Sequence, residues 1–342
     1  MAAAQKNSLD LLRLVAATLV LYSHQHALTG LNEPSFFGWN TFGGAGVTIF
    51  FFLSGMLVWS SWERDPDVKR FFMRRSLRIF PALWVVVLAT VFLLGPVFSN
   101  LSAEDYFASS QTWRYLSTAL LVVRNVLPGV FADNPYPMAV NGSLWTLPVE
   151  FLCYVSVAFL CGIKFVPKGL VSGISLLFFI VLAALAPTLI GSRFAPHFDM
   201  VAVFWWGVFY AYCSNFLTLP ATPHRRLILA LGCIALAVYA SIGPRGVDRT
   251  ALLAFSAVLV HVGLRVTSGA RLTDRLGDLS YGMYIFAFPV QQVLAQWGQG
   301  RGWSLGVSFG LSLALTGAFA YVSWHLVEKR ALLFKPSVRG NA

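Results

Sequence analysis

The feature that most constrains this chain is a succession of apolar runs, each about 17–25 residues long. A run of this length, coiled as a helix, crosses the hydrocarbon core of a bilayer, which is about 30 Å thick. Because lipid offers no hydrogen bonds, the backbone of each run must satisfy its own, as a helix does. The sequence therefore predicts an all-α, polytopic membrane helical bundle of about ten transmembrane helices, near residues 9–28, 46–62, 79–99, 144–165, 169–190, 200–219, 225–243, 250–266, 279–297 and 303–327.

The overall composition supports this class of protein. Of the 342 residues, 57% are hydrophobic and only 11% are charged, whereas a soluble domain carries about 25% charged residues. No linker, composition break or repeat of fixed period divides the chain, so we expect a single membrane domain over residues 1–342. The four cysteines lie in apolar runs without a CxxC pair, and they predict neither a disulfide framework nor a zinc site. We expect no bound metal.

The distribution of positive charge between the runs predicts an orientation. With a cytoplasmic N-terminus, eighteen Lys and Arg residues fall on the cytoplasmic side and six on the other, and Arg13 is the remaining one of the 25. Cytoplasmic loops of membrane proteins are enriched in Lys and Arg, so both termini are predicted to be cytoplasmic. Topology also accounts for the net charge of +11, and no nucleic-acid partner is expected.

The first run carries ionisable residues, which cost roughly 2.5–3.5 kcal/mol each at the middle of a membrane and usually mark a functional site. Arg13 and His24 are eleven positions apart, which places them within about 20° of the same helix face and about 16 Å apart along it. His26 points away from that face and is the weaker candidate. The first run thus presents a cation near one end and an imidazole near the other.

A basic segment follows the second run and contains Arg75 and Arg78, which are neighbours on one face of a helix. Two interpretations are open for this pair. The arginines either anchor the loop at lipid headgroups, or they form a clamp that binds phosphate bidentately. Considered alone, the segment favours the anchor.

Glu150 stands about two turns inside the fourth run, where an unpaired carboxylate is expensive. It is either a structural carboxylate held by hydrogen bonds or a partner that orients an imidazole. Under the predicted topology, Glu150 and His24 both lie in the outer halves of their helices, which favours the second interpretation. The ninth run contains Tyr281 and Tyr284, of a residue type that more often packs than reacts, and Pro289, which predicts a kink. The other histidines have no spaced partners and are interpreted as structural.

Six segments together resemble the acyltransferase-3 family of bacterial integral membrane O-acyltransferases, which modify surface and secreted polysaccharides. In chain order they are SLDLLRLVAATLVLYSH, FFFLSGMLVW, RRSLRIFPALW, NGSLWTLPVEF, LGDLSYGMYIFAFPV and VSWHLVEKR. They occur in the family's order and cover nearly the whole chain. The sequence departs from the family's usual pattern at Leu11 and Leu14, where glycines are common, at Phe286–Phe288, where many members have a His-Trp, and at Arg330, where a proline is usual.

The resemblance implies a role for each matching residue. Arg13 and His24 match the family's Arg-ten-His motif, Arg75 and Arg78 its cytoplasmic Arg-x-x-Arg motif, and Glu150 its fourth-span glutamate. Acyl-CoA, most often acetyl-CoA, is the family's donor. The expected roles are phosphate binding for the arginine pair, contact with the pantetheine arm or thioester for Arg13, and general base or transient acyl carrier for His24, with Glu150 holding its tautomer. Other residues of the matching segments are candidate substrate-binding residues: Asn141, Trp145, Tyr281 and Tyr284.

The expected function is therefore an O-acetyltransferase of the bacterial inner membrane, acting on a hydroxyl of a surface or secreted glycan or of its lipid-linked precursor. A transporter or flippase for a glycan or small solute is the alternative, because intramembrane Arg, His and Glu suit that class as well. The sequence shows no repeat and no pair of Gly- or Pro-broken spans at corresponding positions in two halves. It predicts no particular oligomeric state.

Overall fold

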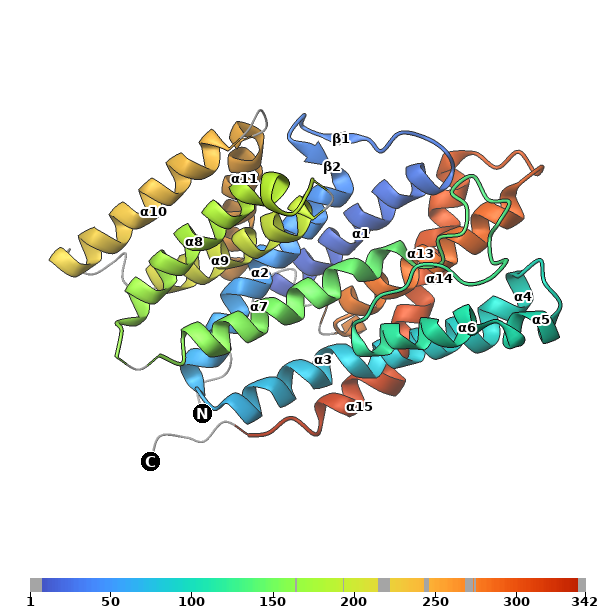
Figure 1. Cartoon of the computed structure of the whole chain (residues 1–342), viewed down its shortest axis with the longest axis horizontal. Coiled ribbons are helices and arrows are strands. Elements are labelled where there is room, and N and C mark those ends of the chain that lie inside the picture. Colours follow the sequence, from blue (N-terminus) through green and yellow to red (C-terminus); the bar gives the residue numbers. More distant parts are fainter. Residues whose placement is uncertain are drawn as a thin grey trace.

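The computed structural model describes residues 8–337 apart from 164, 193, 215–221, 243–245, 268–272 and 274, and the side chains of 223–225 also lie outside the description. The chain is a bundle of long helices with one short antiparallel hairpin, formed by β1 (Ser35–Phe36) and β2 (Asn40–Thr41) (Figure 1). Residues 1–7 and 338–342 lie outside the described residues, and the cytoplasmic location of both termini stays a prediction.

The longer helical elements follow one another along the whole chain, and short helices connect some of them. Two elements, η1 and η4, are π-helical, whereas η2 and η3 are 3₁₀-helices. The elements are α1 (Leu9–Leu28), α2 (Phe42–Arg64), α3 (Val68–Ala89), η1 (Thr90–Leu94), α4 (Gly95–Phe98), α5 (Ala103–Ala108), α6 (Ser110–Tyr115), η2 (Leu116–Leu120), η3 (Gly142–Trp145), α7 (Thr146–Leu160), α8 (Lys168–Leu189), α9 (Ala195–Ser214), α10 (Pro223–Ser241), α11 (Gly246–Arg265), α13 (Ser280–Gly298), α14 (Leu305–Ser323), η4 (Trp324–Glu328) and α15 (Lys329–Leu332).

A helix occupies each of the ten predicted segments, and the all-α prediction is confirmed. Within the described residues, six helical stretches are long and apolar enough to cross a membrane: Phe42–Arg64, Val68–Phe98, Gly142–Leu160, Lys168–Leu189, Gly246–Arg265 and Leu305–Leu332. The protein is thus a multi-pass membrane protein, while the number of ten spans stays a prediction. Helix α1 is not among the six, and its ionisable and amide side chains lower its mean hydropathy.

The helices form two flanks around a central group. Helix α1 packs against α2, α13 and α14, and α2 also packs along α9. In Figure 1, α8, α9, α10 and α11 lie on the left, α13 and α14 lie on the right, and α3 with α4 to α6 runs along the lower edge. This arrangement brings the starts of α1 and α3 to the same end of the bundle as α15.

The contact between α2 and α9 depends on two glycines. A Cβ at Gly55 would overlap the backbone carbonyl oxygen of Phe204, and a Cβ at Gly207 would overlap that of Phe52. Small residues allow helix backbones to approach closely in membranes, where packing contributes to helix association. Since the obstructing atoms belong to backbones, they cannot rotate away as a side chain would.

Substituting Gly55 by alanine is therefore expected to destabilise the bundle by about 1–3 kcal/mol, the usual cost of overpacking. The matched control is Gly310→Ala on α14, where an added Cβ would meet nothing within 4 Å and would raise helix propensity. Thermal unfolding followed by tryptophan fluorescence in detergent should give a lower Tm for Gly55→Ala only. An unchanged Tm for Gly55→Ala would contradict the close helix contact.

The turn between α2 and α3 is held by a buried carboxylate. Asp65 accepts hydrogen bonds from Arg70 Nη2 at 2.5 Å and from Arg74 Nη1 at 2.6 Å. These hydrogen bonds, that of Arg70 first, hold the pKa of Asp65 well below its ordinary value. Asp67 caps α3 by accepting from the backbone N–H of Arg70 at 2.8 Å. The turn thereby sets the start of α3, on which Arg75 and Arg78 follow.

Candidate active site

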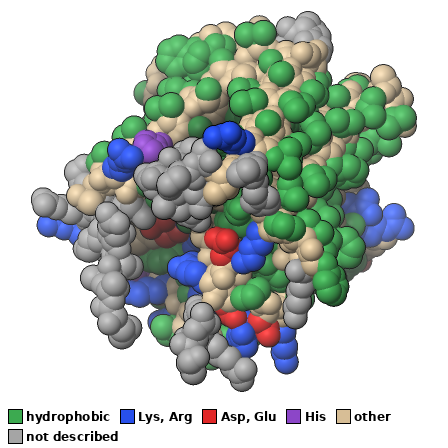
Figure 2. Space-filling view, turned by 90° about the vertical axis from the view of Figure 1, so that its left-hand side faces the viewer, with side chains coloured by type: hydrophobic (Ala, Val, Ile, Leu, Met, Phe, Trp, Pro, Cys, Tyr) green, Lys and Arg blue, Asp and Glu red, His purple; other side chains and the backbone are tan. Residues whose placement is uncertain are grey.

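A cavity of about 680 Å³ lies at the end of the bundle where α1 and α3 begin. Side chains from α1, α2, α3, α7, α13, η4 and α15 line it, together with residues that precede α13. Figure 2 faces this end of the molecule and shows Lys, Arg, Asp and Glu side chains gathered between apolar surfaces. The basic segments that meet here are those that the charge distribution assigns to the cytoplasmic side.

The charge on the cavity wall is predominantly positive, with eight cationic against three acidic side chains among the described residues that line it. Four of the cations are exposed and mark the mouth: Arg64, Arg275, Lys329 and Lys335. A concave surface lined by one sign of charge attracts ligands of the opposite sign. The complete set is Arg13, Arg64, Arg74, Arg75, Arg78, Arg275, Lys329 and Lys335 against Asp10, Glu150 and Asp278.

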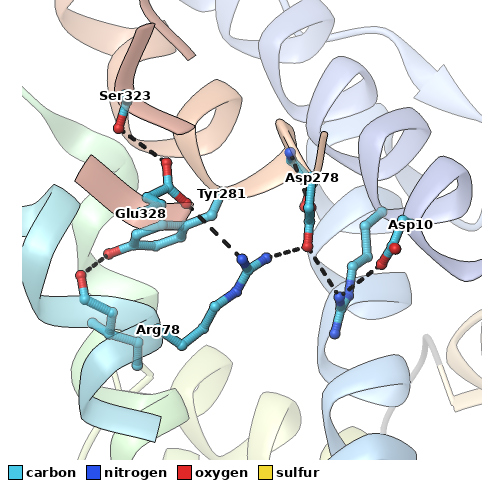
Figure 3. Close-up of polar contacts among 9 residues, drawn as sticks. Asp10, Arg78, Asp278, Tyr281, Ser323 and Glu328 are labelled. Atoms are coloured by element: carbon cyan, nitrogen blue, oxygen red, sulfur yellow. Dashed lines mark hydrogen bonds and ion pairs between the residues drawn. The ribbon is translucent and has the colours of Figure 1, made fainter. Parts of the chain in front are cut away.

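Arg78 lies at the centre of an ion-pair network (Figure 3). Its Nη2 donates to Asp278 Oδ2 at 2.5 Å, and its Nη1 lies 4.0 Å from Glu328 Oε2. Glu328 in turn accepts a hydrogen bond from Ser323 at 2.9 Å. Three segments far apart in the sequence therefore meet at one guanidinium.

Arg13 belongs to the same network. Its Nη1 lies 3.2 Å from Asp10 Oδ1 and 3.5 Å from Asp278 Oδ2. Asp278 also accepts a hydrogen bond from the Ser280 hydroxyl at 2.6 Å. Burial favours a higher pKa for Asp278, but Arg78 and Arg13 outweigh it and hold the pKa at about 2. Asp278 is consequently a carboxylate at neutral pH and is shared by two arginines.

Arg75 has a different environment from Arg78, although it is one helical turn away. Its Nη2 donates to the Ser61 hydroxyl at 3.3 Å, and its guanidinium lies 6.0 and 5.8 Å from the ring centroids of Phe71 and Tyr154. Its Nε is buried and has no hydrogen-bond partner among the described residues. Arg75 therefore lines the cavity with a guanidinium that donates to Ser61 and has no carboxylate within 4.0 Å among the described residues.

Glu150 lies deeper in the same cavity. One of its carboxylate oxygens accepts hydrogen bonds from the Ser54 hydroxyl at 3.0 Å and from the Tyr154 hydroxyl at 2.5 Å. Ser54 stands near the middle of α2, so Glu150 lies near the middle of the bundle. Its position in the outer half of the membrane stays a prediction.

Glu150 lies at this depth in the bundle because of the segment that leads into α7. Residues 126–141 fold back into the bundle, and the Asn141 side-chain amide donates to the backbone carbonyl of Ile285 at 2.9 Å. Ile285 is only five residues from the start of α13, so η3 begins well inside the bundle. Helix α7 then carries Glu150 toward Arg75. Within the described residues, the hydrogen bonds of Glu150 go to Ser54 and Tyr154, and the predicted pairing of Glu150 with His24 is not formed.

His24 lies beyond the cavity, toward the other end of α1. Its ring contacts that of Phe288 with centroids 5.3 Å apart, and its Nδ1 is buried without a hydrogen-bond partner among the described residues. Phe288 is one turn beyond Tyr284 on α13, and Tyr284 lines the cavity. The aromatic ring beside the imidazole therefore stands one helical turn from a lining residue of the cavity, without lining it itself.

The remaining candidates divide between cavity and core. Tyr284 lines the cavity, with its hydroxyl 2.7 Å from Thr146 Oγ1. Tyr281 also lines it and donates to the backbone carbonyl of Ile79 at 2.8 Å (Figure 3). Asn141 is buried outside the cavity, and Trp145, also outside it, packs against the ring of His197. The structure therefore places Asn141 and Trp145 in supporting positions.

Sequence reasoning missed two residues of this site, Asp278 and Glu328. Both stand in segments that match the family, LGDLSYG and VSWHLVEKR. A usable signal was present, because each is an acidic residue at the predicted cytoplasmic end of a run, on the same side as a basic cluster. The need to neutralise buried arginines indicates such residues.

Comparison with known proteins identifies the family of this chain. The family described as Acyltransferase domain matches residues 6–323. An O-acetyl transferase of Shigella phage Sf6 is 32% identical over 343 residues, covering 96% of each chain. Nodulation protein 10 of Rhizobium leguminosarum bv. viciae is 27% identical over 376 residues, covering 97% of this chain and 95% of its own. Exopolysaccharide production protein ExoZ of Rhizobium meliloti is 27% identical and covers 87% of this chain.

The chain belongs to the acyltransferase-3 family, and the resemblance seen in the six segments is confirmed. No solved structure matches it significantly. Family membership favours an acyltransferase over the transporter that the sequence alone left open.

Proposed function

We propose that the protein is a membrane O-acyltransferase that transfers an acyl group, in the first place acetyl, from acyl-CoA to a hydroxyl group. The acceptor is a surface or secreted glycan or its lipid-linked precursor. Relatives named as an O-acetyl transferase and as an exopolysaccharide production protein support this choice. The proposed location is the bacterial inner membrane, with the cavity mouth on the cytoplasmic side.

The observation that carries the proposal is the charge polarity of the cavity. Cations surround its mouth, whereas Glu150 lies among hydroxyl groups deeper inside. An elongated donor with an anionic head and a neutral tail enters such a cavity tail first. Its anionic head then stays beside the cations at the mouth, and only its neutral tail approaches the Glu150 carboxylate. Acyl-CoA has this form, with phosphates at one end and a thioester at the other. The cavity volume of about 680 Å³ lies in the usual range for cofactor sites.

The proposed chemistry uses His24 at the far end of the donor's path. As a general base, its imidazole accepts the proton of the acceptor hydroxyl while the oxygen attacks the thioester carbon. The carbon–sulfur bond breaks, and the leaving CoA sulfur takes up the proton. As an acyl carrier, an imidazole nitrogen attacks the thioester carbon, the carbon–sulfur bond breaks, and CoA leaves as the thiol with the ring N–H proton. The acceptor oxygen then attacks the acyl carbon, the carbon–nitrogen bond breaks, and the hydroxyl proton returns to the imidazole. In both versions the acyl group passes Phe288, whose ring lies against the imidazole.

The direct test is transfer of label. Membranes that contain the protein are incubated with radiolabelled acetyl-CoA and surface polysaccharide isolated from the same strain. Label should appear in the polysaccharide as an alkali-labile ester, and membranes that lack the protein are the control. Purified protein should also show a rise in Tm on addition of CoA, because a ligand that binds the folded state stabilises it. Absence of both results would contradict an acyl-CoA donor.

Lys335 at the cavity mouth gives donor binding a pH dependence. Burial, together with Arg78, Arg75 and Arg13, lowers the pKa of Lys335 to about 8. The side chain is charged below this pH and neutral above it, so affinity for acetyl-CoA is expected to fall as pH rises from 7 to 9.5. One exposed ion pair contributes up to about 1 kcal/mol, or roughly fivefold in Kd. Calorimetric titration over this pH range checks the prediction. Lys335→Met should abolish the fall in affinity; a fall that persists in this variant would have another origin.

A further inference from the structure

Arg75 and Arg78 match one motif, yet the structure gives them unequal surroundings. Arg78 has two carboxylates, Asp278 at 2.5 Å and Glu328 at 4.0 Å, and its guanidinium also lies 5.9 Å from the ring centroid of Trp324. These contacts come from the segment before α13 and from η4 (Figure 3). The charge of Arg78 is therefore already compensated by the protein.

The charge of Arg75 is not compensated in this way. Among the described residues, no carboxylate lies within 4.0 Å of its guanidinium, and the single hydrogen bond goes to the neutral Ser61 hydroxyl. The nearest aromatic ring is that of Tyr154, whose hydroxyl is committed to Glu150. Other cations share the cavity wall and add to the positive potential there.

Glu150 attracts the Arg75 guanidinium only from beyond 4.0 Å. A buried charge without a counter-ion in direct contact is costly, by several kcal/mol after relaxation. A binding site can retain such a charge because its ligand supplies the opposite charge. Guanidinium is suited to phosphate, since its planar N–H donors bind two phosphate oxygens at once. Arg75 lines the cavity, and its buried Nε has no hydrogen-bond partner among the described residues.

We infer that Arg75 is the phosphate-binding arginine of the pair, whereas Arg78 is a positioning residue that joins α3 to Asp278 and Glu328. The inference rests on the proposed function where the phosphate is identified as that of acyl-CoA. A phosphate group of a membrane lipid has the same chemistry, so the test must separate these two sources. Through Asp278, which Arg78 shares with Arg13, the positioning contact also orients the cavity end of α1.

The test compares Arg75→Gln with Arg78→Gln in nanodiscs of zwitterionic lipid. Calorimetry measures the binding of pyrophosphate and of CoA, and thermal unfolding gives Tm for each variant. Arg75→Gln should weaken binding of both ligands about tenfold or more, the loss of a hydrogen bond to a charged group, with Tm unchanged or raised. Arg78→Gln should lower Tm because, among the described residues, it leaves the buried Glu328 without a cation within 4.0 Å and leaves Asp278 with Arg13 alone.

A third variant keeps the test decisive if Arg78→Gln fails to fold. Arg78→Gln combined with Asp278→Asn removes charge from both partners, and it should recover part of the lost Tm and bind pyrophosphate within about threefold of the wild-type Kd. A second preparation containing phosphatidylglycerol identifies the source of phosphate. Competition between this lipid and CoA, lost in Arg75→Gln, would assign the site to a lipid headgroup.

The outcomes separate this inference from the proposed donor. Equal loss of CoA binding in the Arg75 and Arg78 variants, at unchanged Tm, would overturn the inference and leave the CoA donor standing. Binding of pyrophosphate that depends on Arg75, without any binding of CoA, would support the inference and contradict the donor. If wild-type protein binds neither ligand, both fail.

Discussion

Substitution of His24 by alanine is expected to abolish acyl transfer without unfolding the protein or preventing CoA binding. A positioned general base contributes about 10²–10⁴-fold to rate, and an acyl carrier is indispensable. The His24 Nδ1 makes no hydrogen bond with the described residues, so its removal breaks none there. The cavity does not include His24 among its lining residues, so donor binding should persist. Transfer of labelled acetyl groups and CoA titration measure the two properties separately.

His26 is the matched control for this experiment. It lies on the same helix two positions away, and its Nδ1 is 3.0 Å from the Tyr22 backbone carbonyl. His26→Ala should therefore retain transfer within a fewfold of wild type. Full transfer by His24→Ala, at a normal amount of folded protein, would remove the imidazole from the mechanism. His24→Gln adds a second variant that keeps polarity without basicity and should be as inactive as His24→Ala.

Replacing Glu150 by glutamine is the second substitution with a large expected effect. An amide oxygen can still accept the hydrogen bonds that Ser54 and Tyr154 donate, so the fold should survive. The negative charge is lost, and with it the polarity that directs the anionic end of the donor toward the mouth. We expect kcat/KM to fall roughly 10- to 100-fold, the range for an electrostatic contribution inside an enclosed site.

Glu150→Ala distinguishes charge from hydrogen bonding. It removes the acceptor as well, leaves the Ser54 and Tyr154 hydroxyls unsatisfied, and should lower Tm in addition to activity. If Glu150→Gln keeps wild-type kcat/KM while Glu150→Ala loses stability, the carboxylate is structural only. This outcome would support the interpretation of Glu150 as a structural carboxylate held by hydrogen bonds.

The helices of this protein were predictable because their cause is local. Helix α1 begins and ends at Leu9 and Leu28 as predicted, since each apolar run must satisfy its backbone within itself. The family was predictable as well, because six short segments occur in a fixed order. The common face of Arg13 and His24 follows from helix periodicity alone.

The partners of the charged residues were not predictable in the same way. Glu150 was expected beside His24, but the segment before α7 folds inward, and the carboxylate instead meets Ser54 and Tyr154. No pattern along the chain reports such a fold, because it depends on contacts between α13 and residues of a loop. The depth of a helix start is therefore a tertiary property.

The sequence by itself determined that the chain forms membrane helices, that one of them carries a cation and an imidazole on one face, and that a basic cluster accompanies them. Only the tertiary structure decided that Arg78 is neutralised by Asp278, 200 positions away in the chain, while Arg75 donates to the neutral Ser61 hydroxyl. The physical reason is distance: helix formation involves neighbours within four residues, whereas ion pairing depends on how closely separate helices approach.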